Sequence, residues 1–167
     1  LGGNVANGSP VGDTLPVLIA LGATLHLRQG KDVRTLPLED FFIEYGKQDC
    51  RPGEFITAVD VPALSVEQVF RCYKLSKRFD QDISAVLGAF KFELRGGIIV
   101  AARIAYGGMA ATPRRALAAE AALVGLPLAD KDDWSSATNA LALDFQPIDD
   151  MRATAVYRLQ TAQSLLL

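Results

Sequence analysis

The sequence has little histidine and cysteine, with one histidine and two cysteines in 167 residues. Zinc and iron–sulfur sites need several of these side chains at short spacings, and Cys50 and Cys72 lie too far apart for a paired-ligand motif. His26 alternates with two leucines in a strand-like run, and no nucleophile near it indicates a hydrolase triad. We therefore expect no metal site, and unpaired thiols of this kind are typical of a reducing cytoplasm.

Excess positive charge and long apolar runs are also missing. The net charge is −2 and the pI is about 5.4, whereas neutralising nucleic-acid phosphates requires clustered lysine and arginine. The longest apolar run, 15–23, contains Pro16 and Gly22 and is too short to span a bilayer, and no signal peptide precedes it. We therefore expect no nucleic-acid partner and no membrane partner.

Glycine is concentrated in the first thirteen residues, LGGNVANGSPVGD, which contain four of the 14 glycines. This segment has neither helical nor strand periodicity, so it is predicted to be a loop. Glycine lacks a Cβ atom and adopts positive φ, which lets backbone N–H groups approach a ligand closely. The same composition is typical of ordinary turns, so a ligand-binding loop and a structural connector are both open.

A small antiparallel unit is predicted after this loop. Asp13 or Thr14 is placed to cap a short helix with its side chain, with Pro16 in the first turn and Gly22 at the end. The elements expected next are strands at 24–28 and 33–38, an amphipathic helix at 39–45 and a strand at 55–62 that ends at a proline.

The clearest local pattern is a second hairpin, in which Gly96-Gly97 joins two alternating apolar runs, 83–95 and 98–107. A strand at 69–74 precedes it, and three helices follow it. The first helix is expected at 114–124, with its start at Thr112-Pro113, and the second at 134–143, with Asp132 or Asp133 as its cap. Asp149-Asp150 is expected to cap the last helix. The apolar stripe predicted for this helix consists of Met151, Ala155, Leu159, Ala162 and Leu166.

These elements predict an α+β fold. It consists of an antiparallel sheet subdomain with short helices, followed by a hairpin-based sheet packed with three helices. The low-pattern segment 63–68 is the expected boundary, so the two domains are predicted at 1–64 and 65–167.

Three motifs in order along the chain carry a resemblance to a known family. They are LGGNVANGSPVGD at 1–13, YKLSKRFDQDIS at 73–84 and RIAYGGMAATPRRA at 103–116. The chain resembles the FAD-binding small subunit of bacterial xanthine dehydrogenases, within the flavoprotein family of the molybdenum hydroxylases. The resemblance covers essentially the whole chain. It implies that 1–64 is the C-terminal part of the FAD-binding domain and that 65–167 is a C-terminal domain like that of the CO dehydrogenase flavoprotein.

The resemblance implies FAD as the cofactor and a set of contacts to it, with no catalytic residue and no metal ligand in the chain. The implied FAD contacts are Leu1, Gly2, Gly3, Asn4, Asp13, Ile56 and Lys74. Without the resemblance, Asp13 reads as a helix cap, Ile56 as a core residue and Lys74 as part of a solvated charged loop. With it, Ile56 lies against the flavin ring, and the Lys74 ammonium stabilises negative charge that develops on the flavin.

The resemblance also implies a role for the parent protein. A purine is hydroxylated at a molybdenum centre on a large partner subunit, and electrons pass through iron–sulfur clusters to FAD and then to NAD. The [2Fe–2S] clusters and molybdopterin are expected outside this chain, in a cytoplasmic hetero-oligomer. Both ends of the chain read as cuts, so the chain alone is expected to bind FAD weakly or not at all and to lack dehydrogenase activity.

Two alternatives stay open. One is a flavoprotein subunit that serves another substrate, such as carbon monoxide or an aromatic thioester. The other is a non-catalytic scaffold whose last helix and apolar tail dock a partner subunit.

Overall fold

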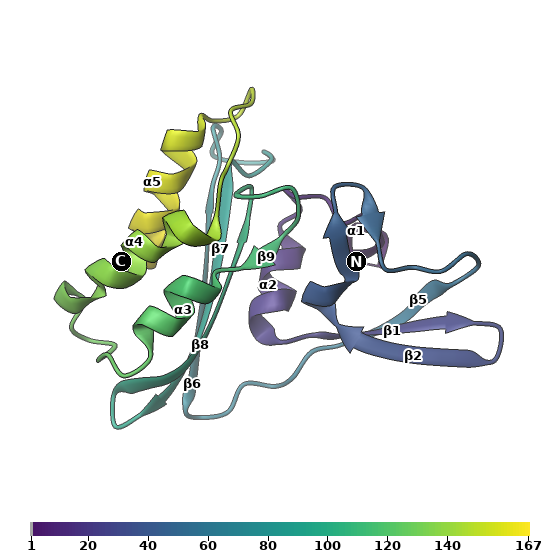
Figure 1. The fold of residues 1–167 in the computed structure, drawn as a ribbon, viewed down its shortest axis with the longest axis horizontal. Coiled ribbons are helices and arrows are strands. Elements are labelled where there is room, and N and C mark those ends of the chain that lie inside the picture. The colour runs from purple at the N-terminus through teal and green to yellow at the C-terminus, as the bar shows by residue number, and fades with distance from the viewer. Residues whose placement is uncertain (1) are drawn as a thin grey trace.

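A four-stranded antiparallel sheet forms the centre of the computed structural model, which describes residues 2–167. Its strands are β6 Gln68–Leu75, β7 Val86–Arg95, β8 Ile98–Gly107 and β9 Arg114–Arg115. They are arranged in the order β6-β7-β8-β9, so each strand pairs with its neighbour in sequence (Figure 1). Gly96 and Gly97 form the turn between β7 and β8, and both have the positive φ that a tight hairpin requires.

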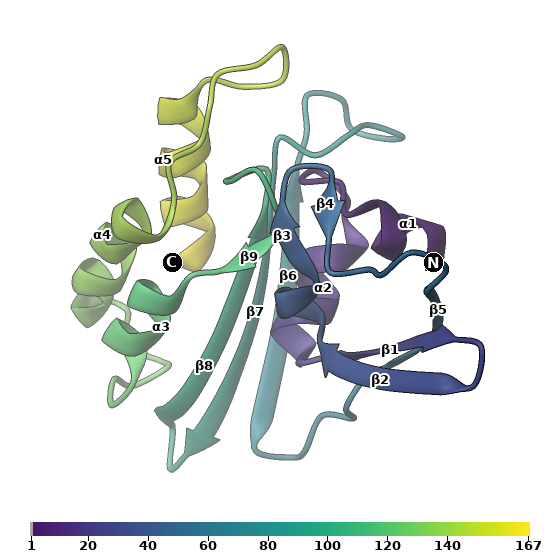
Figure 2. The ribbon, with the colours of Figure 1, turned by 45° about the vertical axis from the view of Figure 1, so that its right-hand side comes forward.

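Different parts of the chain cover the two faces of this sheet. The helices on one face are α3 Leu117–Leu123, α4 Ser135–Asp144 and α5 Ala155–Leu166, and the helix on the other face is α2 Thr14–Leu21 (Figure 1, Figure 2). Because side chains alternate along a strand, Phe90 and Ile104 belong to the core under α3–α5, whereas Ala89 and Ala105 belong to the core under α2. The second face of the sheet is therefore buried by a helix from the N-terminal half.

The N-terminal half builds two smaller antiparallel sheets beside α2. Its elements are α1 Gly2–Asn7, β1 Thr24–Gln29, β2 Asp32–Pro37, the 3-10 helix η1 Leu38–Phe41, β3 Phe42–Glu44, β4 Lys47–Gln48 and β5 Phe55–Asp60. The three-stranded sheet has the order β2-β1-β5, and β3 pairs with β4. Helix α1 contacts both α2 and β5, so the start of the chain is packed against the rest of this half.

The C-terminal end of α2 is held by cations from the central sheet. Arg103 Nη2 donates to the carbonyl oxygen of Ile19 at 2.8 Å and to Glu39 Oε1 at 2.6 Å. Lys91 Nζ donates to the carbonyl oxygen of Leu21 at 3.0 Å, and burial lowers the pKa of this lysine. Positive charge is favourable at a helix C-terminus, where backbone carbonyls lack helical partners. These contacts join the two halves of the chain.

The α+β class and most of the predicted strands are confirmed. Hairpins form at β1–β2 and β7–β8, and strands β5 and β6 occupy the two other predicted segments. Helix α2 ends at Gly22 as expected, with φ of 83°. The strand pairs of the described residues are all antiparallel, in agreement with a fold that lacks βαβ units.

The predicted loop at the start of the chain is wrong for Gly2–Asn7, which form helix α1. Val5 is completely buried in the core under α2. Gly8 ends the helix with φ of 62°, and its N–H donates to the carbonyl oxygen of Asn4 at 3.3 Å. Burial of one apolar side chain thus offsets the low helix propensity of the two glycines.

The helix predicted at 39–45 is also wrong. Only Leu38–Phe41 are helical, as the short η1, and Phe42 begins strand β3. Phe41 and Phe42 are both buried although they are adjacent, and the backbone of Phe42 pairs with Gln48. Adjacent side chains of a helix point in different directions, so one helix face does not bury both phenylalanines. The strand pairing of Phe42 also excludes a helical backbone at this residue.

The first helix after the hairpin starts later than Thr112-Pro113 predicts. The backbone of Arg115 pairs with Ala105 in β8, and its guanidinium bonds with Glu120 at 3.0 Å. This pairing keeps 114–115 extended as β9, so α3 begins only at Leu117. The tertiary contact therefore overrides the local N-cap signal.

The capping aspartates predicted for the last two helices are corrected as well. Asp132 and Asp133 lie in the 3-10 helix η2, Asp132–Trp134, and α4 has no side-chain cap among the described residues. Helix α5 is capped by Thr154, whose hydroxyl accepts from the N–H of Tyr157 at 3.2 Å.

The apolar stripe of the last helix is confirmed only in part. Ala162 and Leu166 are buried, but Met151 precedes α5 and is 83% exposed. The backbone N–H of Ala155 does bond with Asp149, so one of the two predicted aspartates contacts the helix start.

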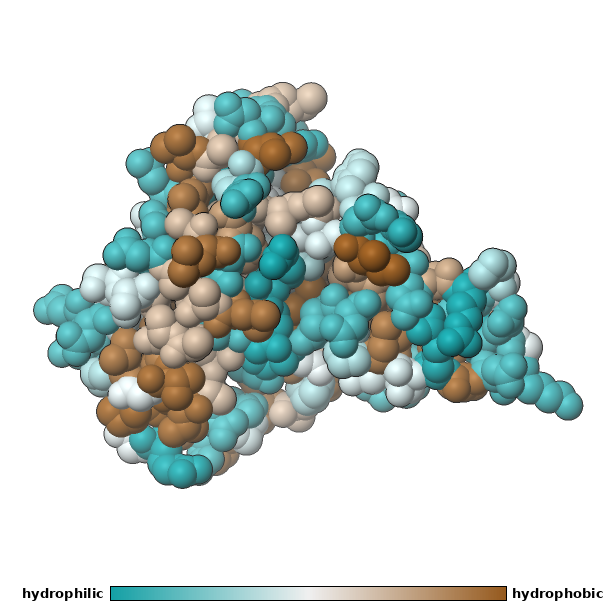
Figure 3. All heavy atoms as spheres, in the orientation of Figure 1, coloured by the Kyte–Doolittle hydropathy of each residue, from teal (hydrophilic) through white to brown (hydrophobic). Residues whose placement is uncertain are grey.

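Surface hydropathy differs between the two halves of the molecule. Figure 3 shows hydrophobic residues gathered over the helical layer on this face, while the tip of the β1–β2 hairpin is mainly hydrophilic. None of the helices that the structure describes is long and apolar enough to cross a lipid bilayer.

Gly108 gives a test of the packing between the strand ends and α5. It has φ of 80°, and a Cβ atom there would lie 2.2 Å from the carbonyl oxygen of Ala85 and 2.9 Å from Arg158 Nη1. We expect Gly108→Ala to destabilise the protein by about 3 kcal/mol, because backbone strain and overpacking add. Gly96→Ala is the matched control, with positive φ and open space around the Cβ position, and should cost about 1 kcal/mol. Equal losses in urea unfolding would contradict this account.

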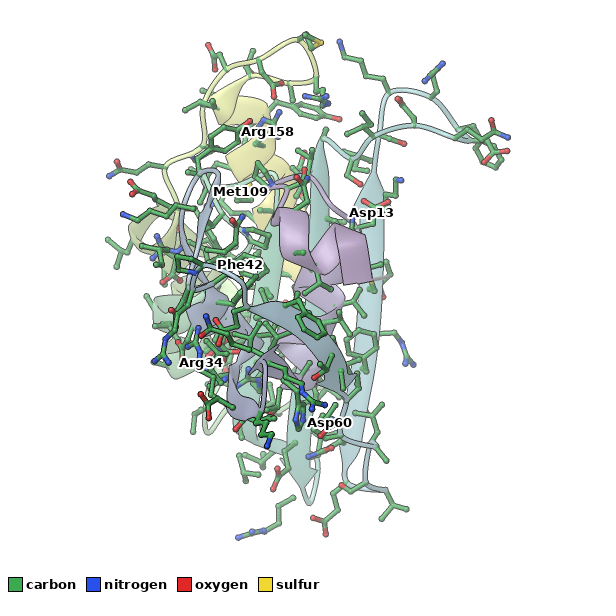
Figure 4. All side chains as sticks on the ribbon, turned by 90° about the vertical axis from the view of Figure 1, so that its right-hand side faces the viewer. Asp13, Arg34, Phe42, Asp60, Met109 and Arg158 are labelled. Carbon is green, nitrogen blue, oxygen red and sulfur yellow. The ribbon has the colours of Figure 1, made fainter. Side chains whose placement is uncertain are left out.

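The Arg34 cluster predicts acid sensitivity. Arg34 in β2 donates to Glu54 Oε1 and to Asp49 Oδ2, both at 2.7 Å, and so fastens the segment before β5 (Figure 4). The hydrogen bond from Arg34 lowers the pKa of Glu54 from 4.5 to about 2. A carboxyl with a depressed folded-state pKa stabilises the fold above its unfolded pKa and loses that contribution as the pH falls through the folded value.

We therefore expect the melting temperature to fall between pH 4.5 and about 2, and Glu54→Gln to flatten this part of the curve while lowering the neutral-pH value. Glu44→Gln, which alters the exposed pair of Glu44 with Lys47, is the control. An unchanged acid profile in Glu54→Gln would rule out this pair as the source.

Candidate functional site

Asp13 and Lys74, both expected to contact FAD, lie side by side. Lys74 Nζ donates to Asp13 Oδ2 at 2.7 Å, although the residues are 61 positions apart in sequence. Asp13 immediately precedes α2, and Lys74 is near the end of β6. In Figure 4, Asp13 lies at the start of α2 beside the central sheet. Packing of α2 on the sheet therefore brings the two charges together.

The Asp13 carboxylate is not the helix cap that the sequence predicts. Asp13 has helical backbone angles, and its side chain makes no capping bond within residues 2–167. Its other oxygen, Oδ1, accepts a hydrogen bond from the hydroxyl of Ser84. The capping prediction is wrong because a charged lysine and a buried hydroxyl use both carboxylate oxygens, and charge-assisted bonds are stronger than neutral ones.

Thr14, the other predicted cap, instead connects α2 to α1. Its hydroxyl donates to Asn4 Oδ1. Asn4 in α1 and Asp13, which directly precedes Thr14 of α2, therefore lie at the same junction between the two helices. Of the expected FAD contacts, Asn4, Asp13 and Lys74 form one linked region.

Gly2 and Gly3 lie in the first turn of α1. A Cβ atom at either position would meet no described atom within 4 Å, so packing in the described part of the chain does not require glycine there. Two glycines in a helix lower its stability by roughly 1 kcal/mol each relative to alanine. Their open surroundings leave room for a ligand to approach the backbone. Leu1, the remaining expected contact in this motif, lies outside the described residues.

Ile56 is placed in a different sheet from Lys74. It lies in β5 opposite Leu27 and packs, partly buried, against the core under α2. This position agrees with the core interpretation of Ile56. No hydrogen bond among the described residues links Ile56 to Asp13 or Lys74.

The charged loop 76–83 is fastened at several points. Lys74 Nζ donates to the carbonyl oxygen of Asp82 at 2.7 Å, and Lys77 Nζ donates to that of Met151 at 2.7 Å. The backbone N–H of Arg78 bonds with Asp82 and lowers the pKa of that carboxyl. Phe79 is fully exposed on this loop. Most of the loop is thus a solvated strap, whereas Lys74 at its base is bound from two sides.

Two residues at this site were not among the ligand contacts expected from the sequence. Ser84 is inside the motif 73–84, but a serine before a strand has no distinctive spacing. Cys72 precedes Lys74 by two positions on β6, so both side chains share the face toward α2. Partial desolvation, and then the charge of Asp13, raise the pKa of the Cys72 thiol, which keeps it protonated.

The arrangement is suited to binding and not to covalent chemistry. An ammonium has three N–H donors, and the hydrogen bonds of Lys74 within residues 2–167 go to two acceptors, Asp13 and Asp82. One donor and a positive charge are therefore available to a ligand, and the Lys74 side chain is 37% exposed.

Family models cover nearly all of the chain. Residues 71–167 match the CO dehydrogenase flavoprotein C-terminal domain, and residues 1–64 match the FAD binding domain in molybdopterin dehydrogenase. The three motifs that suggested this family are therefore supported by matches over both halves.

Individual proteins of several substrate classes are similar to the chain. Nicotinate hydroxylase of Emericella nidulans is 34% identical over 100% of this chain and 13% of its own length. Xanthine dehydrogenase of the same organism is 32% identical over 86% of this chain and 11% of its own length. The structure of CO dehydrogenase from Oligotropha carboxidovorans matches with a TM-score of 0.90 and 29% identity, covering 99% of this chain and 57% of that chain.

The chain thus spans well under two thirds of each of these proteins. One family model alone covers more than half of the chain, from 71 to 167. The chain belongs to the FAD-binding flavoprotein family of the molybdenum hydroxylases, whose cofactor is FAD.

Proposed function

We propose that this chain is part of the FAD-binding subunit of a xanthine dehydrogenase. In the complete enzyme, electrons from purine hydroxylation at a molybdenum-binding subunit pass through iron–sulfur clusters and FAD to NAD. Residues 1–64 belong to the FAD-binding domain and 65–167 to the domain that follows it. Similarity to xanthine dehydrogenases supports this substrate, with 32% identity over 145 residues in one and 33% over 130 residues in another.

The observation that carries the proposal is the meeting of Asn4, Asp13 and Lys74. These residues come from α1, the start of α2 and the end of β6, and each had been expected to contact FAD from its motif alone. Asn4 and Asp13 belong to the motif at 1–13 and Lys74 to the motif at 73–84, so the fold brings together residues of two motifs that were separately expected to contact the cofactor.

The residues present fit a flavin. Gly2 and Gly3 leave the backbone of α1 open to a planar ligand, and Lys74 offers one donor and a positive charge. FAD supplies the electron-transfer chemistry when it is bound. The task of this chain is to bind and orient FAD and to provide a favourable electrostatic field, in which Lys74 supplies positive charge among the described residues.

Asp13 determines how much charge Lys74 presents. The carboxylate and the ammonium form a pair 2.7 Å apart, so the field at the site is that of a dipole with its positive end at Lys74. A ligand that gains negative charge is stabilised most on the lysine side. Asp13 thereby orients Lys74, and Ile56 and Leu1 are proposed to add apolar contact to the ring.

A flavoprotein that serves another substrate is the second candidate. Nicotinate hydroxylase matches the whole chain at 34% identity, and the glyceraldehyde dehydrogenase medium chain of Sulfolobus acidocaldarius at 29%. A flavin site contacts the electron acceptor and not the oxidised substrate. Its residues are therefore expected to differ little between enzymes that oxidise different substrates.

A docking scaffold is the third candidate. An apolar groove of about 460 Å³ is lined by Trp134 and by the end of α5, 164–167. This surface fits contact with a partner subunit, and in a flavoprotein it would serve assembly alongside cofactor binding.

We expect the complete flavoprotein to bind FAD saturably, and Lys74→Ala to raise the dissociation constant about tenfold, equivalent to about 1.4 kcal/mol. Asn4→Ala should weaken binding in the same direction, because it loosens the α1–α2 junction. Flavin fluorescence and absorbance measure both. Lys47→Ala, at an exposed pair in β4, is the control and should bind normally. Absence of FAD binding by the wild-type protein would refute the cofactor site.

The substrate and acceptor need a separate assay. We expect the enzyme isolated with its molybdenum-binding partner to reduce NAD with xanthine, at a higher kcat/KM than with nicotinate or an aldehyde. Bound FAD together with turnover of nicotinate alone would keep the flavoprotein assignment and overturn the xanthine dehydrogenase assignment.

A further inference from the structure

Ser84 is a buried hydroxyl beside the candidate flavin site. The residue is 1% exposed, and its Oγ donates to Asp13 Oδ1 across 71 positions of sequence. A hydroxyl buried without a partner costs about 1–3 kcal/mol. Burial of the Ser84 hydroxyl therefore favours its hydrogen bond with Asp13.

The backbone around Ser84 is fixed from two directions. The N–H of Ala85 donates to the carbonyl oxygen of Leu75 at 2.8 Å, which closes the base of the loop 76–83. The carbonyl oxygen of Ala85 accepts from Arg158 Nη1, and Arg158 in α5 is itself 2% exposed. Arg158 also donates to the carbonyl oxygen of Gly108 at 2.8 Å. Ser84 is thus held in place by a buried arginine and by the neighbouring strands.

Asp13 and Lys74 lack comparable support. Their side chains are 43% and 37% exposed, and lysine has four rotatable side-chain bonds whose freedom opposes a single position. Asp13 is bonded to the partly exposed Lys74, whose other hydrogen bond goes to the carbonyl oxygen of Asp82, and to the buried Ser84. The position of the Lys74 ammonium therefore depends in part on Asp13, and the position of the Asp13 carboxylate depends on Ser84.

Building on the proposed flavin site, we infer that Ser84 is a positioning residue for FAD. Its hydroxyl holds the Asp13 carboxylate, and the carboxylate in turn holds the Lys74 ammonium toward the flavin ring. Loss of the hydroxyl frees Asp13 to rotate toward water, and Lys74 then keeps only its bond to the carbonyl oxygen of Asp82, which lets the ammonium move relative to the flavin. The side chain of Ser84 acts through Asp13 without touching the cofactor.

The test uses the complete, FAD-loaded flavoprotein and the variant Ser84→Ala, which removes one oxygen from a buried site. We expect the dissociation constant for FAD to rise about fivefold, in line with the loss of one hydrogen bond of ordinary strength. The affinity for reduced relative to oxidised FAD should fall about threefold, which lowers the two-electron potential by about 14 mV. Lys74→Met should shift the same ratio about tenfold, or about 30 mV.

The control is Ser76→Ala, which removes a hydroxyl that bonds inside the loop with the carbonyl oxygen of Arg78 at 2.8 Å. Its potential should equal that of the wild-type protein. Ser84→Ala in an Asp13→Ala background should have no further effect, since the side chain on which Ser84 acts is gone. Should Ser84→Ala fail to fold, Ser84→Cys, a weaker donor of similar shape, is expected to shift the potential in the same direction by less.

The outcomes separate this inference from the proposed function. A potential that moves in Lys74→Met but not in Ser84→Ala would overturn the role of Ser84 and keep the flavin site. An equal shift in the Asp13→Ala background would also overturn it, because the effect would then be structural. Unchanged affinity and potential in Lys74→Met would overturn the flavin site itself.

Discussion

The structure depends on the packing of one short helix against the second face of the central sheet. A sheet with apolar residues on both faces needs cover on both, and α3–α5 supply only one side. Helix α2 supplies the other from the N-terminal half, and Arg103 and Lys91 hold its terminal carbonyls. This contact makes one folded unit of two sequence segments that resemble separate domains.

The same packing places the candidate site. Since the C-terminal end of α2 is fixed by the sheet, its N-terminal end, about 12 Å away for eight residues, must lie near the far end of β6. Asp13 is at that end, and Lys74 is the residue that it meets. The charge pair is thus a consequence of how α2 is anchored, and the buried Ser84 defines where the carboxylate stays.

The chemistry available at this junction is electrostatic. The described residues around Lys74 offer a cation, a carboxylate and hydroxyl groups, and the nearby Cys72 thiol has a raised pKa. Such a site suits a protein that holds a redox cofactor and tunes its charge while the cofactor supplies the reactive atoms. Proteins named for different substrates, nicotinate, xanthine and carbon monoxide, are all similar to this chain.

Local patterns in the sequence determined the elements whose signals are contained within a few residues. The Gly96-Gly97 hairpin, the Gly22 end of α2 and the β1–β2 hairpin follow from alternation and from glycine at positive φ. The motifs also identified the family, whose cofactor is FAD, and family models match the chain over 1–64 and 71–167.

Tertiary structure alone decided the rest. Helix α1 exists because Val5 reaches the core, and β9 replaces a helical turn because Arg115 finds Ala105 and Glu120. Asp13 stays at the N-cap position of α2, but its side chain bonds with partners that are 61 and 71 positions away instead of capping the helix. Ser84 shows no signal in sequence, because its importance lies in burial and in one distant carboxylate. Helix propensity and hydrophobic periodicity depend on residues that are close in the sequence. The features described here depend on which distant segments pack together, so they are determined only when the chain folds.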